Sequence, residues 1–288
     1  MNLKHEKIWV AGHTGMVGSA LCKRLQQHAI LKSYRSNVDL TNEKDVHDFV
    51  QQHQPSIIFL CAAKVGGINA NAAQPVDFLL ENLKIQNNVI AAAYEAGVKK
   101  LICLGSACTY PKHAPQPIKE EHLFTGMPEV TNIWYATAKL AGIKLAQAFR
   151  QQHGLNAIIA MPTNSYGPGD NFKEGQGHVI PGLMRRIHEA KIQDLPTVNI
   201  WGSGSPLREF IHVNDLADAL VFLAENYESG DIINVGSGDE LSILELAETI
   251  AQVVEYRGKI ETDKTKPDGM ARKLLDSSKL SALGWKAK

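Results

Sequence analysis

Short apolar runs alternate with amphipathic stretches across the first 165 residues of the chain. Each run has the length of a strand, is rich in β-branched side chains and is apolar at consecutive positions, as in strands covered on both faces. The runs cover residues 7–12, 29–35, 56–63, 100–106 and 156–164, and stretches with helical spacing cover 15–27, 78–96 and 133–152. This order predicts an α/β fold built on a doubly wound parallel sheet.

The pattern loosens after residues 166–172, where glycine and polar side chains predominate. Asn214 is expected to cap one later helix, and Ser242 with Glu245 has the spacing of a capping box at the start of another. The strand over 232–238 could return to the main sheet. The remaining elements expected here are a helix over 178–190 and a strand over 197–204.

The charges of the chain balance, with 30 basic and 30 acidic side chains. This balance gives no electrostatic footprint for nucleic acid or an anionic membrane surface, so we expect neither as a partner. The amino terminus is charged, and its apolar run of about five residues is shorter than the core of a signal peptide. No stretch approaches the roughly 18 apolar residues of a membrane span. We therefore expect a cytoplasmic protein.

The four cysteines show no CxxC pairing, and two of them lie inside strand-like runs. This argues against a disulfide framework or a zinc site, and no metal is expected. Three of the four are predicted to be small core hydrophobes. The four cysteines are Cys22, Cys61, Cys103 and Cys108.

A glycine-rich loop joins the first predicted strand to the first predicted helix. Gly12, Gly15 and Gly18 form a G-x-x-G-x-x-G pattern there, which lets a turn close and lets a diphosphate approach the free N–H groups of the helix. Arg35, at the end of the second strand, can meet a ribose 2′-phosphate and favours NADP over NAD. A solvated surface arginine is the alternative. Asp39 and Leu40 follow as adenine-edge contacts.

A tyrosine and a lysine one helical turn apart are the first candidates for catalysis. Tyr135 and Lys139 share one face of a predicted helix. A free phenol titrates near pH 10, so we expect the Lys139 ammonium to lower the pKa of Tyr135 and make it a usable proton donor to a ketone. Ser106, where the fourth strand ends, is placed to hydrogen-bond the same ketone oxygen.

Eight segments of the chain carry a resemblance to one family. It resembles the extended short-chain dehydrogenase/reductases, whose cofactor domain is a Rossmann fold, and among them most closely the GDP-L-fucose synthase family. The match runs from residue 11 to 276. The segments are AGHTGMVGSAL, AAKVGGINAN, LGSACTYPK, YATAKLAGIKL, MPTNSYGPGDNF, HVIPGLMRR, WGSGSPLREFIHV and KPDGMARKLLD.

The resemblance implies an enzyme that epimerises the two carbons flanking a ketone of a GDP-sugar and then reduces the ketone with NADPH. In that family a cysteine and a histidine exchange the protons, and they match Cys108 and His178 here. Thiols and imidazoles titrate close enough to neutral pH to move protons either way. Without the match, Cys108 could equally be a buried small hydrophobe, and His178 is one of eleven histidines.

The same transfer assigns the binding residues and the assembly. Residues 1–165, with a returning segment near 205–238, would bind the cofactor, and residues 166–288 would mainly bind the sugar. In the family, two such helices of each subunit form a four-helix contact in a homodimer. Here the helices over 78–96 and 133–152 would form it. A surface arginine is the alternative for Arg186. The substrate residues are Arg186, Trp201, Arg208 and Asp268, and further cofactor residues are Thr14, Met16, Val17, Leu104, Gly105, Lys139, Pro162, Thr163, Asn164, Ser165 and His178.

Three departures from the family pattern stand out. The family usually has an arginine where this chain has Thr14, which weakens the expected hold on a 2′-phosphate. Trp134 precedes Tyr135 where a smaller side chain is usual. The chain stops at LGWKAK, where relatives continue into a helix, so it is expected to be either naturally short or truncated.

Three other functions fit parts of the pattern. A related enzyme could act on a GDP-4-keto-heptose or another deoxysugar, with one epimerisation or none. A 4,6-dehydratase or 4-epimerase with bound NAD is a second rival, but dehydratases generally follow the strand-end hydroxyl with an acidic residue, and Ala107 and Cys108 stand there. A non-catalytic NADP sensor is the third, against which the intact Ser106, Tyr135 and Lys139 argue.

Overall fold

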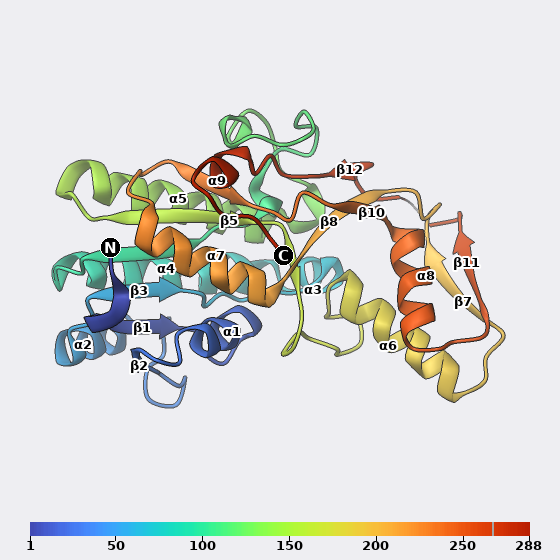
Figure 1. Ribbon diagram of the computed structural model, residues 1–288, viewed down its shortest axis with the longest axis horizontal. Coiled ribbons are helices and arrows are strands. Elements are labelled where there is room, and N and C mark those ends of the chain that lie inside the picture. The colour runs from blue at the N-terminus through green and yellow to red at the C-terminus, as the bar shows by residue number, and fades with distance from the viewer. Residues whose placement is uncertain (267) are drawn as a thin grey trace.

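The computed structural model describes residues 1–266 and 268–288. Six parallel strands form its main sheet, in the order β2-β1-β3-β4-β5-β9 (Figure 1). The predicted α/β fold with a doubly wound sheet is therefore confirmed. The strands are β1 (Lys7–Ala11), β2 (Ala29–Leu31), β3 (Ile57–Leu60), β4 (Lys100–Leu104), β5 (Ala157–Pro162) and β9 (Ile232–Val235).

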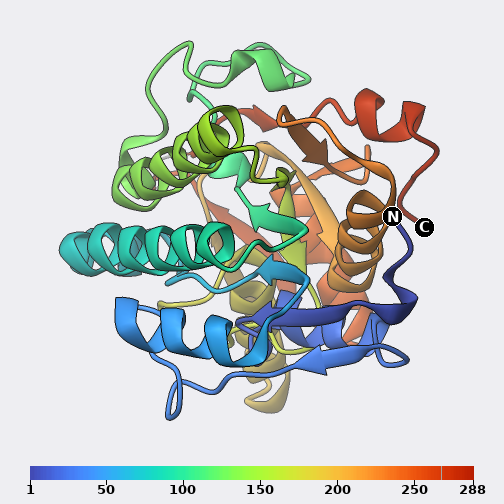
Figure 2. The same cartoon turned by 90° about the vertical axis from the view of Figure 1, so that its left-hand side faces the viewer.

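Helices cover both faces of this sheet, which explains the consecutive apolar positions of its strands. Successive residues of β3 point to opposite sides, so Ile57 and Phe59 join one buried cluster while Ile58 and Leu60 join the other. Fully burying a side chain of the size of Phe59 stabilises the fold by about 1.5–3 kcal/mol. One layer holds α2 (Glu43–His53), α4 (Pro75–Glu95) and α5 (Ile133–His153), and the other holds α1 (Met16–Arg24) and α7 (Val213–Asn226) (Figure 2).

A smaller lobe has a hydrophobic cluster of its own, packed between two helices and a two-stranded parallel sheet. The predicted capping box is confirmed at α8, because the Ser242 hydroxyl accepts the Glu245 N–H at 3.1 Å and the Glu245 carboxylate accepts the Ser242 N–H at 2.7 Å. The elements of this lobe are α6 (Val179–Ile192), β7 (Thr197–Trp201), α8 (Ile243–Val253) and β11 (Lys259–Asp263).

Four short strands join the main sheet to the small lobe (Figure 1). β8 is central to them, pairing with β10 antiparallel and with β6 and β12 parallel. Their bounds are β6 (Asn164–Tyr166), β8 (Leu207–His212), β10 (Glu240–Ser242) and β12 (Arg272–Lys273), and two short helices are α3 (Ile68–Ala73) and α9 (Ser278–Ala282).

Two sequence expectations need correction. Asn214 does not cap α7: the cap is His212, whose Nδ1 accepts the Asn214 N–H at 3.3 Å, so Asn214 lies inside the first turn. β2 ends at Leu31 rather than near residue 35, because as an edge strand it pairs with β1 over three residues only. β9, by contrast, does return to the main sheet, beside β5.

The cysteines are all free thiols. Burial raises the pKa values of Cys61 and Cys103 to about 12 and also raises that of Cys22, as expected for cysteines that act as core side chains. Across residues 1–266 and 268–288, no helix combines the length and the apolar character needed to cross a membrane.

Candidate active site

The glycine loop lies where the strand order of the sheet reverses, since β1 stands between β2 and β3. Gly12 has φ +91°, and a Cβ added there would lie 2.6 Å from the Ala62 amide nitrogen. A Cβ at Gly18 would lie 2.1 Å from the Gly12 carbonyl oxygen, so this glycine lets the helix approach the loop. A Cβ at Gly15 would meet only the Gly12 oxygen, at 3.5 Å. The loop is thus tight within the fold and open at Gly15.

The amino terminus of α1 completes this cradle. Gly15 is its N-cap and supplies no side-chain hydrogen bond, so the first amides of the helix, from Met16 and Val17 onwards, are not capped by that residue. Uncapped helix N–H groups next to an open glycine are the arrangement that receives a diphosphate. The residues present therefore fit a dinucleotide.

The segment after β2 lies ready for the adenosine end of such a cofactor. Arg35 is exposed there. The Asp39 carboxylate accepts the Thr41 N–H at 2.9 Å and its hydroxyl at 2.8 Å, and these bonds hold the pKa of Asp39 below its usual value. The Leu40 carbonyl accepts a hydrogen bond from Asn88 at 3.0 Å. Asp39 and Leu40 are therefore fixed by local bonds, whereas Arg35 extends into solvent.

His13, in the glycine loop, is a buried polar residue that sequence reasoning did not single out. Its ring meets Tyr34 edge to face at 4.6 Å, which ties the loop to the segment after β2. Burial and then the charge of Lys32 lower the pKa of His13, so its imidazole is neutral at pH 7. The sequence offered one indication of this role, because His13 lies between Gly12 and Gly15 of the glycine pattern.

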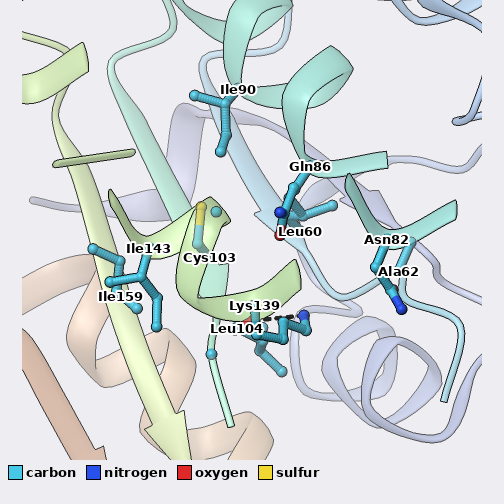
Figure 3. A pocket seen from close by; sticks show the side chains of 12 residues that line it. Leu60, Ala62, Asn82, Gln86, Ile90, Cys103, Leu104, Lys139, Ile143 and Ile159 are labelled. Atoms are coloured by element: carbon cyan, nitrogen blue, oxygen red, sulfur yellow. Dashed lines mark hydrogen bonds between the residues drawn. The ribbon is translucent and has the colours of Figure 1, made fainter. Parts of the chain in front are cut away.

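Ser106, Tyr135 and Lys139 meet at the carboxyl end of β4. Ser106 caps the short helix Ala107–Thr109 and accepts the Cys108 N–H at 3.2 Å. Lys139 lies beneath the tyrosine, with its Nζ 5.9 Å from the centroid of the Tyr135 ring. Its ammonium donates to the Leu104 carbonyl at 2.8 Å, beside a cavity of about 20 Å³ between the sheet and two helices (Figure 3). That cavity holds about one water molecule, so it is not the sugar site.

The expectation that Lys139 lowers the pKa of Tyr135 is wrong in this structure. Burial, and next the charge of Cys108, raise the pKa of Tyr135, and a hydrogen bond with Ser106 only partly opposes them. The Lys139 ammonium bonds to Leu104 instead, and its own burial lowers its pKa to about 8. The phenol is therefore protonated at neutral pH, as a proton donor must be.

Cys108 has surroundings different from those of the other three cysteines. Burial alone would raise its pKa, but the charge of Lys273, hydrogen bonds with Ser106 and Lys273, and the charge of Arg208 together hold it below the usual thiol value. The Lys273 ammonium donates to the Cys108 Sγ at 3.5 Å. The sequence offered no local signal for Lys273, because 165 residues separate it from the thiol.

His178 is the N-cap of α6 and is exposed. The segment that leads into His178 is held by a backbone bond, because the Gly67 N–H donates to the Gln176 carbonyl at 3.0 Å. Nearby Asp170 is half-buried, which raises its pKa, while the hydrogen bond from the Asn171 N–H and the charge of His178 oppose that shift. Over residues 1–266 and 268–288, no hydrogen bond or ion pair joins His178 to Cys108 or Tyr135. The role of His178 stays a prediction.

The four expected substrate residues gather on the small lobe and on β8. Arg186 donates to the Asn199 carbonyl of β7 at 3.0 Å, and burial followed by Arg185 lowers its pKa. Trp201 ends β7 with 61% of its surface exposed. Asp268 accepts the Ser203 N–H and hydroxyl, both at 2.8 Å.

Arg208 is the member of this set that reaches the catalytic side. It donates to the carbonyls of Leu207 at 2.7 Å and Met270 at 2.6 Å. Burial lowers its pKa, and the nearby Cys108 opposes that shift. Arg208, which is expected to bind substrate, therefore also acts by its charge on the Cys108 thiol.

The segment expected to face the nicotinamide follows the end of β5 at Pro162. Asn164 donates to the Glu209 carbonyl at 2.9 Å, and Thr163 donates to the same oxygen at 3.3 Å, which fixes the start of β6 (with Ser165) against β8. At the end of β4, Gly105 packs against Met161, where an added Cβ would lie 2.3 Å from the sulfur. These bonds give the predicted cofactor strip a fixed backbone.

Glu209 is a second residue that sequence reasoning missed. Its carboxylate is fully buried and accepts the N–H groups of Gly238 at 2.9 Å and Leu275 at 3.1 Å. Burial raises its pKa despite these bonds. Glu209 thus ties β8 to the segment that carries Lys273.

A family comparison agrees with this geometry. Residues 8–236 match the model of the NAD dependent epimerase/dehydratase family. The chain belongs to this family. Because the match spans β1 to the end of β9, it covers the whole main sheet and the residues gathered at its carboxyl edge.

Two relatives illustrate the similarity in sequence. GDP-L-fucose synthase 1 of Arabidopsis thaliana is 56% identical over 292 residues, which are 100% of this chain and 90% of the relative. GDP-L-fucose synthase of Escherichia coli (strain K12) is 45% identical over 295 residues, which are 98% of this chain and 92% of the relative.

Two solved structures are similar in fold and sequence. A GDP-6-OMe-4-keto-L-xylo-heptose reductase from C. jejuni has a TM-score of 0.93 and 35% identity, covering 100% of this chain and 94% of that one. A GDP-L-fucose synthetase from Naegleria fowleri bound to NADP has a TM-score of 0.90 and 30% identity, covering 99% and 89%.

Proposed function

We propose that this chain converts GDP-4-keto-6-deoxy-D-mannose into GDP-L-fucose with NADPH, as a bifunctional 3,5-epimerase and 4-reductase. The observation that carries the proposal is the placement of Cys108 beside Ser106 and Tyr135, which puts a thiol suited to proton exchange next to the residues proposed for the reduction. Relatives at 45–56% identity named GDP-L-fucose synthase support the choice of sugar.

NADP(H) is the cofactor that fits the glycine loop and the segment after β2. The open face at Gly15 and the uncapped start of α1 suit its diphosphate, and exposed Arg35 suits its 2′-phosphate. Thr14 adds no cation, so the preference over NAD rests on Arg35. When bound, the nicotinamide supplies a hydride to the ketone carbon.

Reduction needs a proton for the ketone oxygen as its carbon accepts the hydride. Tyr135 gives its phenolic proton to that oxygen, and the raised pKa of the phenol keeps this proton in place at neutral pH. Ser106 donates a hydrogen bond to the same oxygen and stabilises negative charge there. Lys139 holds the ribose side of the site and is fixed by Leu104.

Epimerisation exchanges a proton on each carbon flanking the ketone. The Cys108 thiolate takes the proton from carbon, and the electron pair of the broken C–H bond moves into an enolate whose oxygen is held by Tyr135 and Ser106. His178 returns a proton to carbon from the opposite face, and proton exchange with solvent restores both groups before the second carbon reacts. The lowered pKa of the Cys108 thiol supports its role as the base.

The nucleotide end of the substrate would lie on the small lobe, in the region assigned to residues 166–288. The guanidinium groups of Arg186 and Arg208 suit a diphosphate, and Trp201 presents an exposed ring to the base. Asp268 suits hydroxyl groups of the sugar or the ribose.

A second candidate is a reductase of GDP-4-keto-heptoses, which the similarity to the C. jejuni heptose reductase favours. Product analysis by NMR after incubation with NADPH and either GDP-4-keto-6-deoxy-mannose or a GDP-4-keto-heptose separates the two. Formation of GDP-L-fucose supports the main proposal. Turnover of the heptose alone would replace it, and no NADPH oxidation with either sugar would indicate a non-catalytic sensor.

We also propose a homodimer that forms through α4 and α5. Their outer faces, with the turn before α5, expose Val76, Leu80, Val130 and Trp134. Light scattering should give a mass twice 31.6 kDa, and Leu80→Asp should halve it. A monomeric wild type contradicts the proposal.

A free catalytic thiol suits a reducing compartment, and we place the reaction in the cytoplasm.

A further inference from the structure

Cys108 faces a cation that none of the assigned roles uses. The Lys273 ammonium lies 3.5 Å from the Cys108 Sγ, and Lys273 is only 9% exposed. A buried lysine is costly unless a partner compensates its charge. Its partner on this side is a thiol, which compensates that charge only as a thiolate.

We propose that Lys273 is a positioning residue that holds Cys108 as a thiolate and so makes it the base of the epimerisation. The proposal rests on the role proposed above for Cys108. The reaction it serves is unchanged: the thiolate takes the C–H proton, and the ammonium stabilises the thiolate before and after that step.

The fold places Lys273 firmly. β12 pairs with β8 so that Lys273 is the register partner of Arg208, and both therefore stand at the same level of the strand pair. The segment that follows is anchored by the buried Glu209 carboxylate, which accepts the Leu275 N–H at 3.1 Å. Lys273 is thus held by backbone pairing on one side and by Glu209 on the other.

Other charged and titratable groups facing Cys108 do not replace Lys273. The Arg208 guanidinium is engaged by the carbonyls of Leu207 and Met270, so it acts on the thiol through its charge alone. Tyr135, on α5, is neutral at pH 7, and Ser106 is a neutral hydrogen-bonding partner. Within residues 1–266 and 268–288, Lys273 is the cation that both bonds to the sulfur and acts on it by charge.

The test is the pH dependence of Cys108 alkylation by iodoacetamide, quantified at the Cys108 peptide by mass spectrometry. It uses the full chain without sugar, so its outcome does not depend on the sugar or on the chemistry proposed for it. In the wild type, the midpoint should lie below the ordinary thiol value of about 8.5. Lys273→Met should raise it by about one unit, which lowers alkylation near neutral pH about tenfold, and Lys273→Arg should keep most of the reactivity.

Lys279→Met is the matched control, since Lys279 lies on α9 with 54% of its side chain exposed and pairs with Glu120. It should keep the wild-type profile. With sugar present, solvent deuterium incorporation by Lys273→Met should fall near neutral pH and recover at alkaline pH, which a merely structural role would not produce.

Two results would overturn the proposal: a Lys273→Met profile that superimposes on the wild type, or a wild-type midpoint at or above that of an ordinary thiol. The second needs no variant, so the proposal can be decided even if Lys273→Met fails to fold. Lys273→Met could also shift the alkylation profile without any loss of deuterium exchange. That result would support the stabilisation of the Cys108 thiolate by Lys273 and refute the role of Cys108 as base.

Discussion

The reductase side and the epimerase side of the candidate site are built in different ways. Ser106, Tyr135 and Lys139 come from one edge of the main sheet and its neighbouring helix, within 34 residues of sequence. Cys108 shares that edge, but its cation lies on β12 and the proposed second acid/base begins α6. Reduction thus depends on one rigid unit, whereas epimerisation depends on the alignment of distant segments.

The largest effect should come from Tyr135→Phe, which removes the proton donor but leaves the packing. NADPH oxidation with the keto-sugar should fall by roughly a thousandfold, in the range for loss of a general acid. NADPH oxidation is followed optically under single-turnover conditions. Tyr94→Phe, on the half-exposed part of α4, is the matched control and should be unaffected. Unchanged turnover in Tyr135→Phe would remove this residue from the mechanism.

Cys108→Ser should separate the two sides of the site. Solvent deuterium incorporation into the sugar should fall by about a hundredfold, because a hydroxyl is a far weaker base near neutral pH than a thiolate. Hydride transfer should stay largely usable, since Ser106, Tyr135 and Lys139 are untouched. Cys22→Ser serves as control. If the Cys108 variant exchanges deuterium like the wild type, the thiol is not the base.

Lys139→Met should stabilise the folded protein near neutral pH while it impairs reduction. The pKa of Lys139 is lowered from 10.5 to about 8, so the cost of burying the ammonium is fully present below pH 8. From there up to about pH 10.5, the unfolded chain still binds the proton that the folded chain has lost, and stability rises with pH. Over this pH range the free energy of unfolding of the wild type rises by roughly 2–4 kcal/mol through Lys139.

Denaturant unfolding at several pH values checks this linkage, as the difference between wild type and Lys139→Met. Groups common to both proteins, such as the buried cysteines, cancel in that difference. Lys144→Met, on the exposed face of the same helix, should show no such pH-dependent difference. A difference that is flat with pH would mean that Lys139 titrates normally.

The smallest effect should come from the small lobe. Ser242→Ala removes the capping box of α8 and should cost about 1 kcal/mol of stability, measured by thermal unfolding. Thr249→Ala, which loses only a bond to a carbonyl of the same helix, should be close to neutral. In Ser242→Ala, the KM for the sugar should rise slightly and the affinity for NADPH should stay unchanged. A larger loss of NADPH affinity than of sugar affinity would contradict the assignment of the lobe to the sugar.

The sequence predicted the features that depend on neighbours along the chain. The apolar runs located the strands of the main sheet, the glycine spacing located the loop after β1, and the i, i+4 spacing placed Tyr135 and Lys139 on one face of α5. These are local properties, because strand burial, turn conformation and helical period are set within a few residues.

The features it did not predict depend on contacts between distant segments. Lys273 meets Cys108 across 165 residues, and Glu209 anchors that segment from the middle of β8. The pKa of Tyr135 went the opposite way from expectation, because it depends on how deeply the phenol is buried and on where the Lys139 ammonium finds its acceptor. Spacing along a helix fixes neither.

The place of β9 affects how the chain is made. The edge of β5 acquires its partner only at residues 232–235, after α6, β7, β8 and α7 have all been synthesised. A ribosome that adds about 5–20 residues each second leaves that apolar edge unpaired for several seconds. Open strand edges invite pairing with other chains. Nascent chains are therefore most exposed to aggregation, and most in need of a chaperone, in the interval between the emergence of β5 and that of β9.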